Sequence, residues 1–294
     1  MVDGDIQREG LHITKPWGTG EMRFGQGVGS NRNGDMELGA LLVPGIWLHF
    51  SYDGEAGKMA VRNYMASEPL DRVSYESVRT DHLTVQSEIV NLHNALRRKV
   101  QPTAGNMLKM SWEEDAAANA RELSKFCEEG ESNAFQRRIK NTFCGENTYL
   151  TPYPISWSQV IGSWYNESKH FKYGKWAPAH QERRVRNYTQ VVWATSYLIG
   201  CGASPCCKRK LPQYFYVCHY CHEGNDPELR NKPYRLGNPC KECPQNCDNK
   251  LCTNPCLFYD EYTDCKIQTK VPGCSQLSVQ LQCKASCFCK TEIL

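Results

Sequence analysis

The chain has 294 residues, of which 40% are apolar and 23% charged, and its formal net charge is +3. These values are typical of a globular chain, and the charge is too balanced to indicate a protein that binds polyanions, so no nucleic-acid partner is predicted. The sequence contains no run of about 18 apolar residues, and therefore no transmembrane segment is predicted.

The first 80 residues predict a poorly ordered N-terminal extension, because they are rich in glycine and lack a hydrophobic period. Residues 1–10 are charged and do not resemble a signal peptide. The one candidate core of a secretion signal is residues 38–50, but this run follows Glu37 instead of a basic region and is broken by Pro44. A small ordered extension is the alternative.

Helical patterns begin near Thr84. Apolar residues recur there at helical spacing as far as Val100, and Pro102 ends the run. Two further helices are predicted to start at capping boxes, one at residues 111–114 (SWEE) and one at residues 156–159 (SWSQ).

Three later runs are rich in β-branched and aromatic residues and predict short strands at residues 188–194, 197–202 and 214–221. Helices followed by strands within about 140 residues are typical of a layered domain. The predicted fold class is therefore α/β.

The 17 cysteines divide the chain unevenly. None lies in the first 126 residues, seven lie between residues 127 and 221, and ten lie between residues 240 and 289. The last block has uneven spacing, no histidine and a single CxxC pair, Cys240 with Cys243, so disulfides are favoured over a zinc site. Disulfides in turn indicate an oxidising, extracellular compartment. Residues 226–239, rich in proline and charge, predict a linker.

Several ordered motifs resemble a known family: HNALRR (93–98), CGENTY (144–149), YTQVVW (188–193) and YVCHYC with the following GN (216–225). They are similar to the signatures of the CAP superfamily, and the ten-cysteine tail resembles its cysteine-rich secretory protein family. Details such as HYCHEGNDPE and LCTNPC resemble the epididymal, sperm-coating member. The resemblance covers residues 84–294.

The resemblance implies four parts of the chain. After the extension of residues 1–80, a three-layer α-β-α sandwich (the CAP domain) would occupy residues 81–225. A linker and disulfide hinge would follow at 226–255, and a small helical, cysteine-rich, toxin-like domain at 256–294.

The resemblance also implies which cysteines pair. The implied pairs are Cys127–Cys206, Cys144–Cys221, Cys201–Cys218, Cys240–Cys247, Cys243–Cys252, Cys256–Cys289, Cys265–Cys283 and Cys274–Cys287. Cys207 is left over, although it could exchange with Cys206. Three lysines and arginines follow Cys207 and would lower the pKa of its thiol, but an orphan thiol on a basic loop is more often adventitious or intermolecular than catalytic.

Many superfamily members carry a cleft tetrad of two histidines and two glutamates that can hold a metal. Matched to this sequence, the glutamates are present as Glu146 and Glu167, whereas the histidine positions hold Glu131 and Asn187. Such a set is poor for zinc, although it could attract a hard cation such as calcium. We therefore expect neither a metal, nor a cofactor, nor a catalytic residue.

The remaining candidate groups have structural interpretations. His93 lies on a helical stripe and is predicted to be a buried, hydrogen-bonded histidine. His222, which lies near His219 after a disulfide cysteine, is predicted to be a solvated loop residue. The basic run at residues 180–186 predicts a solvated loop, with an anionic partner site as the alternative. Two sequons, at Asn166 and Asn187, predict glycosylation.

The leading functional hypothesis, implied by the resemblance, is a secreted and non-catalytic protein that binds a cell-surface protein or an ion channel, particularly on sperm. The alternatives are a carrier that binds sterol or another lipid in the CAP domain, and a metal-dependent hydrolase. The missing imidazoles count against the hydrolase.

Overall fold

The computed structural model describes residues 36–43, 46–52, 59–64, 71–128, 130–140, 142–176, 184–206, 212–262 and 264–294. By its contacts the chain divides into two compact units, Met1–Pro69 and Leu70–Leu294. In the first unit, the described residues form an antiparallel three-stranded sheet instead of an unpatterned segment. Its strands are β1 (Met36–Val43), β2 (Ile46–Tyr52) and β3 (Met59–Tyr64), in the order β1-β2-β3. The candidate signal core at residues 38–50 falls largely on β1 and β2.

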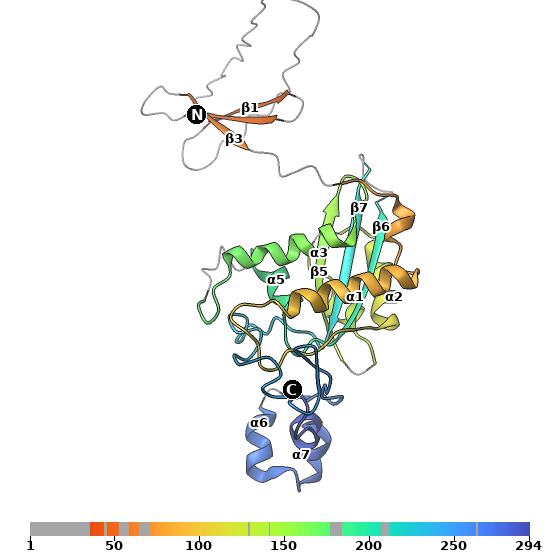
Figure 1. Cartoon of the computed structure of the whole chain (residues 1–294), viewed down its shortest axis with the longest axis vertical. Helices are drawn as coiled ribbons and strands as arrows, with labels where there is room; N and C mark the ends of the chain where they lie inside the picture. Colours follow the sequence, from red (N-terminus) through yellow and green to blue (C-terminus); the bar gives the residue numbers. More distant parts are fainter. Residues whose placement is uncertain are drawn as a thin grey trace, which may run out of the picture. The chain divides into compact units, whose positions relative to one another are not determined.

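The second unit is built on a four-stranded sheet with the order β4-β6-β7-β5 (Figure 1). Strand β4 pairs with β6 in parallel, and the other pairs are antiparallel. The strands are β4 (Ser111–Trp112), β5 (Cys144–Thr151), β6 (Leu198–Pro205) and β7 (Tyr214–Cys221). The flanking helices are η1 (Tyr75–Val78), α1 (Leu83–Arg97), α2 (Glu114–Ser124), η2 (Ala134–Arg137), α3 (Trp157–Asn166), η3 (Glu167–His170) and α5 (Arg186–Val191).

Strand β7 shows how the two helical layers divide. Tyr216 and Tyr220 point to one face, where they stack against Trp157 of α3 and His93 of α1. Val217 points to the other face and packs with Ala120 of α2. This alternation follows from the two-residue period of a strand. Helices α1 and α3 therefore cover one face of the sheet and α2 covers the other. This arrangement is the α-β-α sandwich that the sequence predicts.

Two glycines of β6 allow α2 to lie close to the sheet. A Cβ atom built at Gly200 would lie 2.1 Å from the amide nitrogen of Ala117, and one at Gly202 would lie 2.4 Å from the Cα of Arg121. These distances are far below a normal contact. The helix contributes small residues, Ala116 and Ala117, to the same contact, and both are completely buried.

The helix starts predicted from the sequence are confirmed in part. The helix from Thr84 is confirmed as α1, and the capping box of Ser156 is present, because its side chain accepts from Gln159 N and the Gln159 side chain accepts from Ser156 N. The capping box at Ser111 is wrong. Ser111 and Trp112 instead form the edge strand β4, and α2 begins at Glu114 with no side-chain cap.

The predicted strand at residues 188–194 is also wrong, since residues 186–191 form α5. β-branched residues do not exclude a short helix when tertiary contacts require it. Thr189 illustrates this, because its hydroxyl lies 2.6 Å from Asn225 Oδ1 and 3.1 Å from the carbonyl of Val185 one turn earlier. The strands predicted at 197–202 and 214–221 are confirmed as β6 and β7.

Residues 71–80, expected in the extension, pack on the sandwich. Val78 is buried in the main core, and its carbonyl accepts from Trp157 Nε1 at 2.9 Å. The Tyr75 hydroxyl donates to the carbonyl of Ala203 at 2.9 Å. The ordered part of this unit therefore begins before the helical pattern in the sequence does.

The segment expected as a linker is held against the sandwich. Tyr234 is buried in the main core. The backbone on either side of it is hydrogen-bonded, with Ala194 N donating to Pro233 O and Gly105 N donating to Arg235 O, both at 2.8 Å. A run rich in proline and charge is typical of a linker. Here, however, its backbone carbonyls accept hydrogen bonds from the loop before β4 and from the turn after α5.

The hinge, residues 240–252, is joined to the sandwich as well. It contains a short hairpin of β8 (Cys247–Asp248) and β9 (Leu251–Cys252), and Leu251 is fully buried in the sandwich core. Lys109 N donates to Cys252 O, and Cys252 N donates to Met107 O. The tail, residues 256–294, follows with α6 (Cys265–Gln268), η4 (Thr269–Gly273), α7 (Leu277–Gln282) and α8 (Lys284–Phe288).

Candidate functional site

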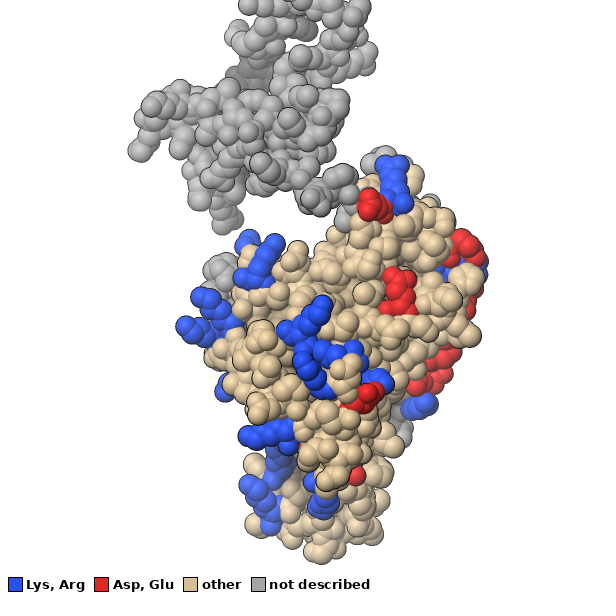
Figure 2. Space-filling view, viewed as in Figure 1, with Lys and Arg blue, Asp and Glu red and all other residues tan. Residues whose placement is uncertain are grey.

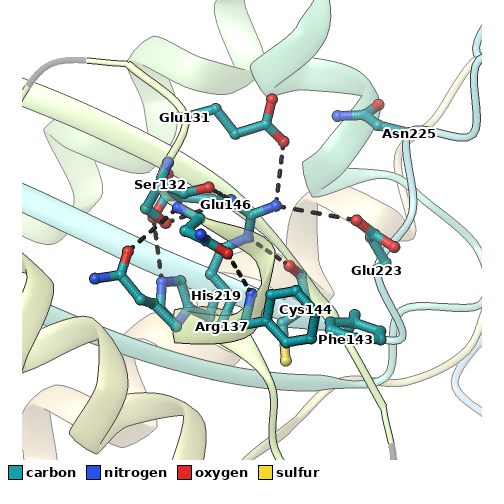
Figure 3. Close-up of polar contacts among 12 residues, drawn as sticks. Glu131, Ser132, Arg137, Phe143, Cys144, Glu146, His219, Glu223 and Asn225 are labelled. Atoms are coloured by element: carbon teal, nitrogen blue, oxygen red, sulfur yellow. Dashed lines mark hydrogen bonds and ion pairs between the residues drawn. The ribbon is translucent and has the colours of Figure 1, made fainter.

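The site implied by the family tetrad is a cleft at one end of strands β5 and β7 (Figure 3). Glu146 on β5 lies opposite His219 on β7, and 3.3 Å separates Glu146 Oε2 from His219 Nε2. The same carboxylate accepts from Ser132 twice, from the backbone nitrogen at 3.0 Å and from the hydroxyl at 2.7 Å. Burial raises the pKa of Glu146, but the bonds from His219 and Ser132 outweigh it and hold that pKa below its usual value. Glu146 is therefore a fixed, ionised group.

Arg137 is the buried cation of this cleft. Its side chain is 2% exposed, and its Nε donates to the Cys144 carbonyl at 2.8 Å. Its other nitrogens reach the Ser132 carbonyl, Glu131 at 3.2 Å and Glu223 at 4.0 Å. Figure 3 shows the guanidinium between these groups. A buried arginine with this many acceptors is held rigidly.

Glu131, at a position where the family resemblance implies a tetrad histidine, is bound by two arginines. Its Oε1 pairs with Arg137, and its Oε2 pairs with Arg186 at 2.6 Å. Arg186 comes from the basic run at residues 180–186. Of this run the structure describes residues 184–186, and here Arg186 is engaged with the cleft and not solvated on its own.

Glu167 and Asn187 form a second hydrogen-bonded pair. Asn187 Nδ2 donates to Glu167 Oε1 at 2.7 Å, and the backbone nitrogen of Tyr188 donates to Oε2 at 3.0 Å. Burial raises the pKa of Glu167 above its usual value. Asn187 therefore presents an amide donor where the family often presents an imidazole acceptor.

These residues do not fit a divalent cation. All six carboxylate oxygens of Glu131, Glu146 and Glu167 already accept a hydrogen bond or an ion pair. Two guanidinium groups lie in the same cleft, and like charge repels a metal ion. The neutral imidazole nitrogens that anchor zinc are missing from the tetrad positions. A bound calcium ion would have to displace these partners as well.

Comparison with known proteins gives the family. Over 219 residues the chain is 57% identical to cysteine-rich secretory protein 1 of Macaca mulatta, and the alignment covers 74% of this chain and 88% of that protein. The chain belongs to the cysteine-rich secretory protein family. It is also 43% identical over 231 residues to cysteine-rich secretory protein 3 of Homo sapiens, which covers 79% of this chain and 93% of that protein.

Family models agree with this assignment, and a solved structure has a similar fold. The CAP model, described as the cysteine-rich secretory protein family, matches residues 90–220, and the Crisp model matches residues 240–294. The crystal structure of Na-ASP-1 has a TM-score of 0.50 and 24% identity, over 64% of this chain and 52% of that one. That likeness shows a shared sandwich fold.

Two cavities meet at the cleft of this family member. One of about 420 Å³ lies between α2 and strands β5 and β7, with Leu123, Phe126 and Phe215 beside Glu146. The other, of about 1030 Å³, runs from Glu131 along residues 223–235 and reaches Lys266 and Leu294 of the tail. Glu131 lines both.

The eight disulfides of the structure are the pairs that the family resemblance implies. Cys206 bonds to Cys127, and Cys207 lies outside the described residues. Among the described residues, the group whose ligand atoms lie close enough for a metal is Cys240, Cys243 and Cys252, within 4.8 Å of one another. Disulfides already use these sulfurs, so none is a thiolate ligand.

Two histidines outside the tetrad positions, His93 and His222, pack against aromatic residues. His93 is fully buried, with Nδ1 donating to Ile89 O at 2.8 Å and Nε2 lying 2.9 Å from the Tyr220 hydroxyl, so its predicted role is confirmed. The prediction for His222 is wrong, because this ring is half-buried against Tyr197 and burial lowers its pKa. In the part of the chain that the structure describes, no helix has the length and apolarity needed to cross a membrane.

Sequence reasoning missed Arg137, Ser132 and the contact between Glu146 and His219. The sequence did contain a signal for that contact. If Cys144 and Cys221 are bridged across two antiparallel strands, the residue two positions after Cys144, Glu146, lies opposite the residue two positions before Cys221, His219. Arg137 had no such signal, since it lies in a short η2 helix within a run of polar residues.

Proposed function

We propose that this chain is a secreted, non-catalytic protein that attaches to cell surfaces through its tail, with a membrane protein such as an ion channel of sperm as the target. The observation that carries the proposal is the exposed apolar surface of the tail. Of the fifteen exposed large hydrophobic residues in the described chain, nine lie within residues 256–294. They are Leu257, Phe258, Tyr262, Ile267, Val271, Leu277, Leu281, Phe288 and Leu294.

Such a surface on a small domain supports a docking role. The tail has three disulfides of its own, so it keeps its shape with few apolar residues inside. Residues that would otherwise build a core are free to face outward, and many exposed apolar residues on so small a domain support an interaction site. The secretory relatives and the eight disulfides support an extracellular setting.

The cleft supports a non-catalytic role. Its glutamate oxygens are all engaged, and its serine, Ser132, donates its proton to Glu146 instead of to a histidine base. A nucleophile needs a neighbouring base that accepts its proton. Glu146 is ionised but is held by three donors, so the arrangement supports a structural network.

A lipid carrier is the second candidate, and one cavity favours it. The cavity of about 420 Å³ is large enough for a small ligand, and Leu123, Phe126 and Phe215 give it apolar walls. Three glutamates, Glu128, Glu131 and Glu146, also line it, which disfavours a neutral sterol. Extraction of the purified protein followed by mass spectrometry distinguishes the two functions, since a carrier retains lipid at close to one molecule per chain.

The proposed function is tested by crosslinking the full chain to intact sperm and identifying the captured protein. A variant with Ile267→Ser and Leu277→Ser should lose capture, because both side chains are more than two-thirds exposed and neither supports the fold. Leu83→Ser with Phe135→Ser, equally exposed on the sandwich, is the matched control. Equal capture by all three proteins would refute docking by the tail.

A further inference from the structure

Four cationic side chains gather where the C-terminal end of α1 meets the hinge. They are Arg98, Lys99, Lys109 and Lys250, here called the hinge patch. Arg98 and Lys99 follow α1 directly, and Arg98 Nε donates to the carbonyl of Asn249 at 2.9 Å, next to Lys250. Figure 2 shows lysine and arginine side chains over this end of α1 and the hinge.

The hinge patch carries a local excess of positive charge. The acidic group that contacts it is Asp248, whose Oδ2 lies 2.6 Å from Lys109 Nζ. Four cations less one carboxylate leave three positive charges, which equals the formal net charge of +3 of the whole chain. The formal charges of the rest of the chain therefore sum to zero, and the even charge of the composition conceals a local cationic surface at the hinge patch.

The scaffold holds the hairpin backbone that carries part of this charge. The β8–β9 hairpin turns at Asn249 and Lys250, and both residues have positive φ, 45° and 69°. Such a turn favours asparagine and glycine, so a lysine at 250 is conformationally costly while it adds a charge at the tip. The bridges Cys240–Cys247 and Cys243–Cys252 hold the base of the hairpin.

We propose that the hinge patch binds a sulfated polysaccharide chain. A linear polymer with an anionic group on nearly every sugar can pair with cations that come from three separate segments of the fold. Such binding needs no pocket, and none of the four residues lines either cavity at the cleft. A backbone already held by two disulfides does not have to be ordered on binding, which increases affinity.

The composition of the surface separates this ligand from a lipid bilayer. Stable peripheral membrane binding takes apolar side chains that enter the interface, in addition to electrostatic attraction to anionic lipids. None of the exposed large hydrophobic residues of the described chain belongs to the hinge patch, and those of the tail lie in a separate domain. The patch is thus suited to a hydrophilic polyanion, and the proposed attachment to cells supplies only the extracellular setting.

The experiment measures binding of the full, oxidised chain to immobilised heparin, to desulfated heparin and to phosphatidylserine vesicles. Lys99→Gln with Lys250→Gln should weaken heparin binding by about tenfold, because two of the four cations are lost. The control pair, Lys125→Gln with Lys290→Gln, removes the same charge elsewhere and should change binding by less than about twofold. Asp248→Asn, which removes the opposing carboxylate, should tighten binding.

Each outcome decides the inference. The inference is supported if binding depends on sulfate and decreases in a fixed order. Asp248→Asn should bind most tightly, followed by wild type and the control pair, and the patch pair (Lys99→Gln with Lys250→Gln) should bind most weakly. Equal losses in both lysine pairs, undiminished binding to desulfated heparin, or stronger binding to vesicles than to heparin would overturn it. Capture of the sperm protein by the patch pair at wild-type levels would leave the proposed function intact, so the two proposals fail separately.

Discussion

Glu146 and His219 face each other across the β5–β7 pair, with 3.3 Å between Oε2 and Nε2. His219 is fully buried, and its Nδ1 has no hydrogen-bond partner among the described residues. A proton on Nδ1 would leave a buried donor unpaired, so the proton belongs on Nε2, which donates to Glu146. The imidazole nearest to the cleft glutamates is thus already committed to a hydrogen bond.

The first prediction concerns zinc and follows from the hydrogen bond between Glu146 and His219. Zinc added to the purified protein should not bind stoichiometrically at micromolar concentration, because the oxygens of Glu146 and the Nε2 of His219 are occupied. Isothermal titration with zinc and with calcium measures this. Tight binding of one ion per chain that disappears in Glu146→Gln or Glu167→Gln would show that the cleft retains a metal site.

The second prediction concerns pH and His93. Burial lowers the pKa of His93 to about 4 from 6.5, so between these values the unfolded chain binds a proton that the folded chain does not. The contribution to stability is complete above pH 6.5 and is lost as the pH falls toward 4. It amounts to about 3 kcal/mol at roughly 1.4 kcal/mol per pKa unit.

Denaturant unfolding at pH 7.0, 5.5 and 4.0 measures this contribution. His93→Gln should be less stable at pH 7 and should show a shallower fall toward pH 4. His170→Gln, at an exposed position, is the control and should retain the full slope. Identical slopes for all three proteins would assign the acid sensitivity to other groups.

The third prediction tests the close contact between α2 and β6. Gly200→Ala should destabilise the fold by more than about 2 kcal/mol, because its Cβ would meet the Ala117 backbone at 2.1 Å and the backbone has no room to yield. Gly162→Ala in α3 is the matched control, with no atom within 4 Å of the added Cβ. It should stabilise the protein by about 0.5–1 kcal/mol, since alanine is the better helix former. A thermal unfolding series that ranks the two variants in the opposite order would contradict this packing.

The fourth prediction concerns the two sequons. Asn166 is exposed, whereas the side-chain nitrogen of Asn187 donates to Glu167 at 2.7 Å. A glycan replaces one of the two hydrogens on that nitrogen and adds bulk beside it, so modification of Asn187 would disturb the contact with a half-buried carboxylate. Asn166 should therefore be glycosylated more often. Peptide mapping of the secreted protein after enzymatic deglycosylation gives both occupancies, and a higher value at Asn187 would contradict the expectation.

The fifth prediction addresses the hinge. Leu251→Ala should cost about 2–5 kcal/mol, because Leu251 is fully buried in the sandwich core. Leu257→Ala, six residues later and 74% exposed, should change stability by less than about 0.5 kcal/mol. Hydrogen exchange of the β6 and β7 amides reports whether the loss reaches the sandwich. Unchanged exchange in Leu251→Ala would mean that hinge and sandwich are energetically independent.

Periodic patterns predicted the parts of the fold that depend on local sequence. Helix α1 has a clear hydrophobic period, strands β6 and β7 are rich in β-branched and aromatic residues, and the motifs identified the α-β-α sandwich. The helix start predicted at Ser111 was wrong because a capping box and an edge strand can have the same residues. The residue that pairs with Ser111 in β6 lies 87 positions later in the chain, so no local pattern reveals it. The position of the buried Arg137 side chain depends on acceptors from three separate segments of the chain. No local sequence pattern indicates that these segments come together.

The burial of Leu251 has a consequence for how the molecule is made. The ribosome delivers the chain from its N-terminus, so strands β4 to β7 emerge before the hinge does. The sandwich core lacks one side chain until residue 251 arrives, and the hairpin that carries it is held by two cysteine pairs, Cys240–Cys247 and Cys243–Cys252. Completion of the large domain is thereby tied to oxidation of a segment that follows it in the chain, so a chain arrested before residue 251 leaves an apolar gap for chaperones to recognise.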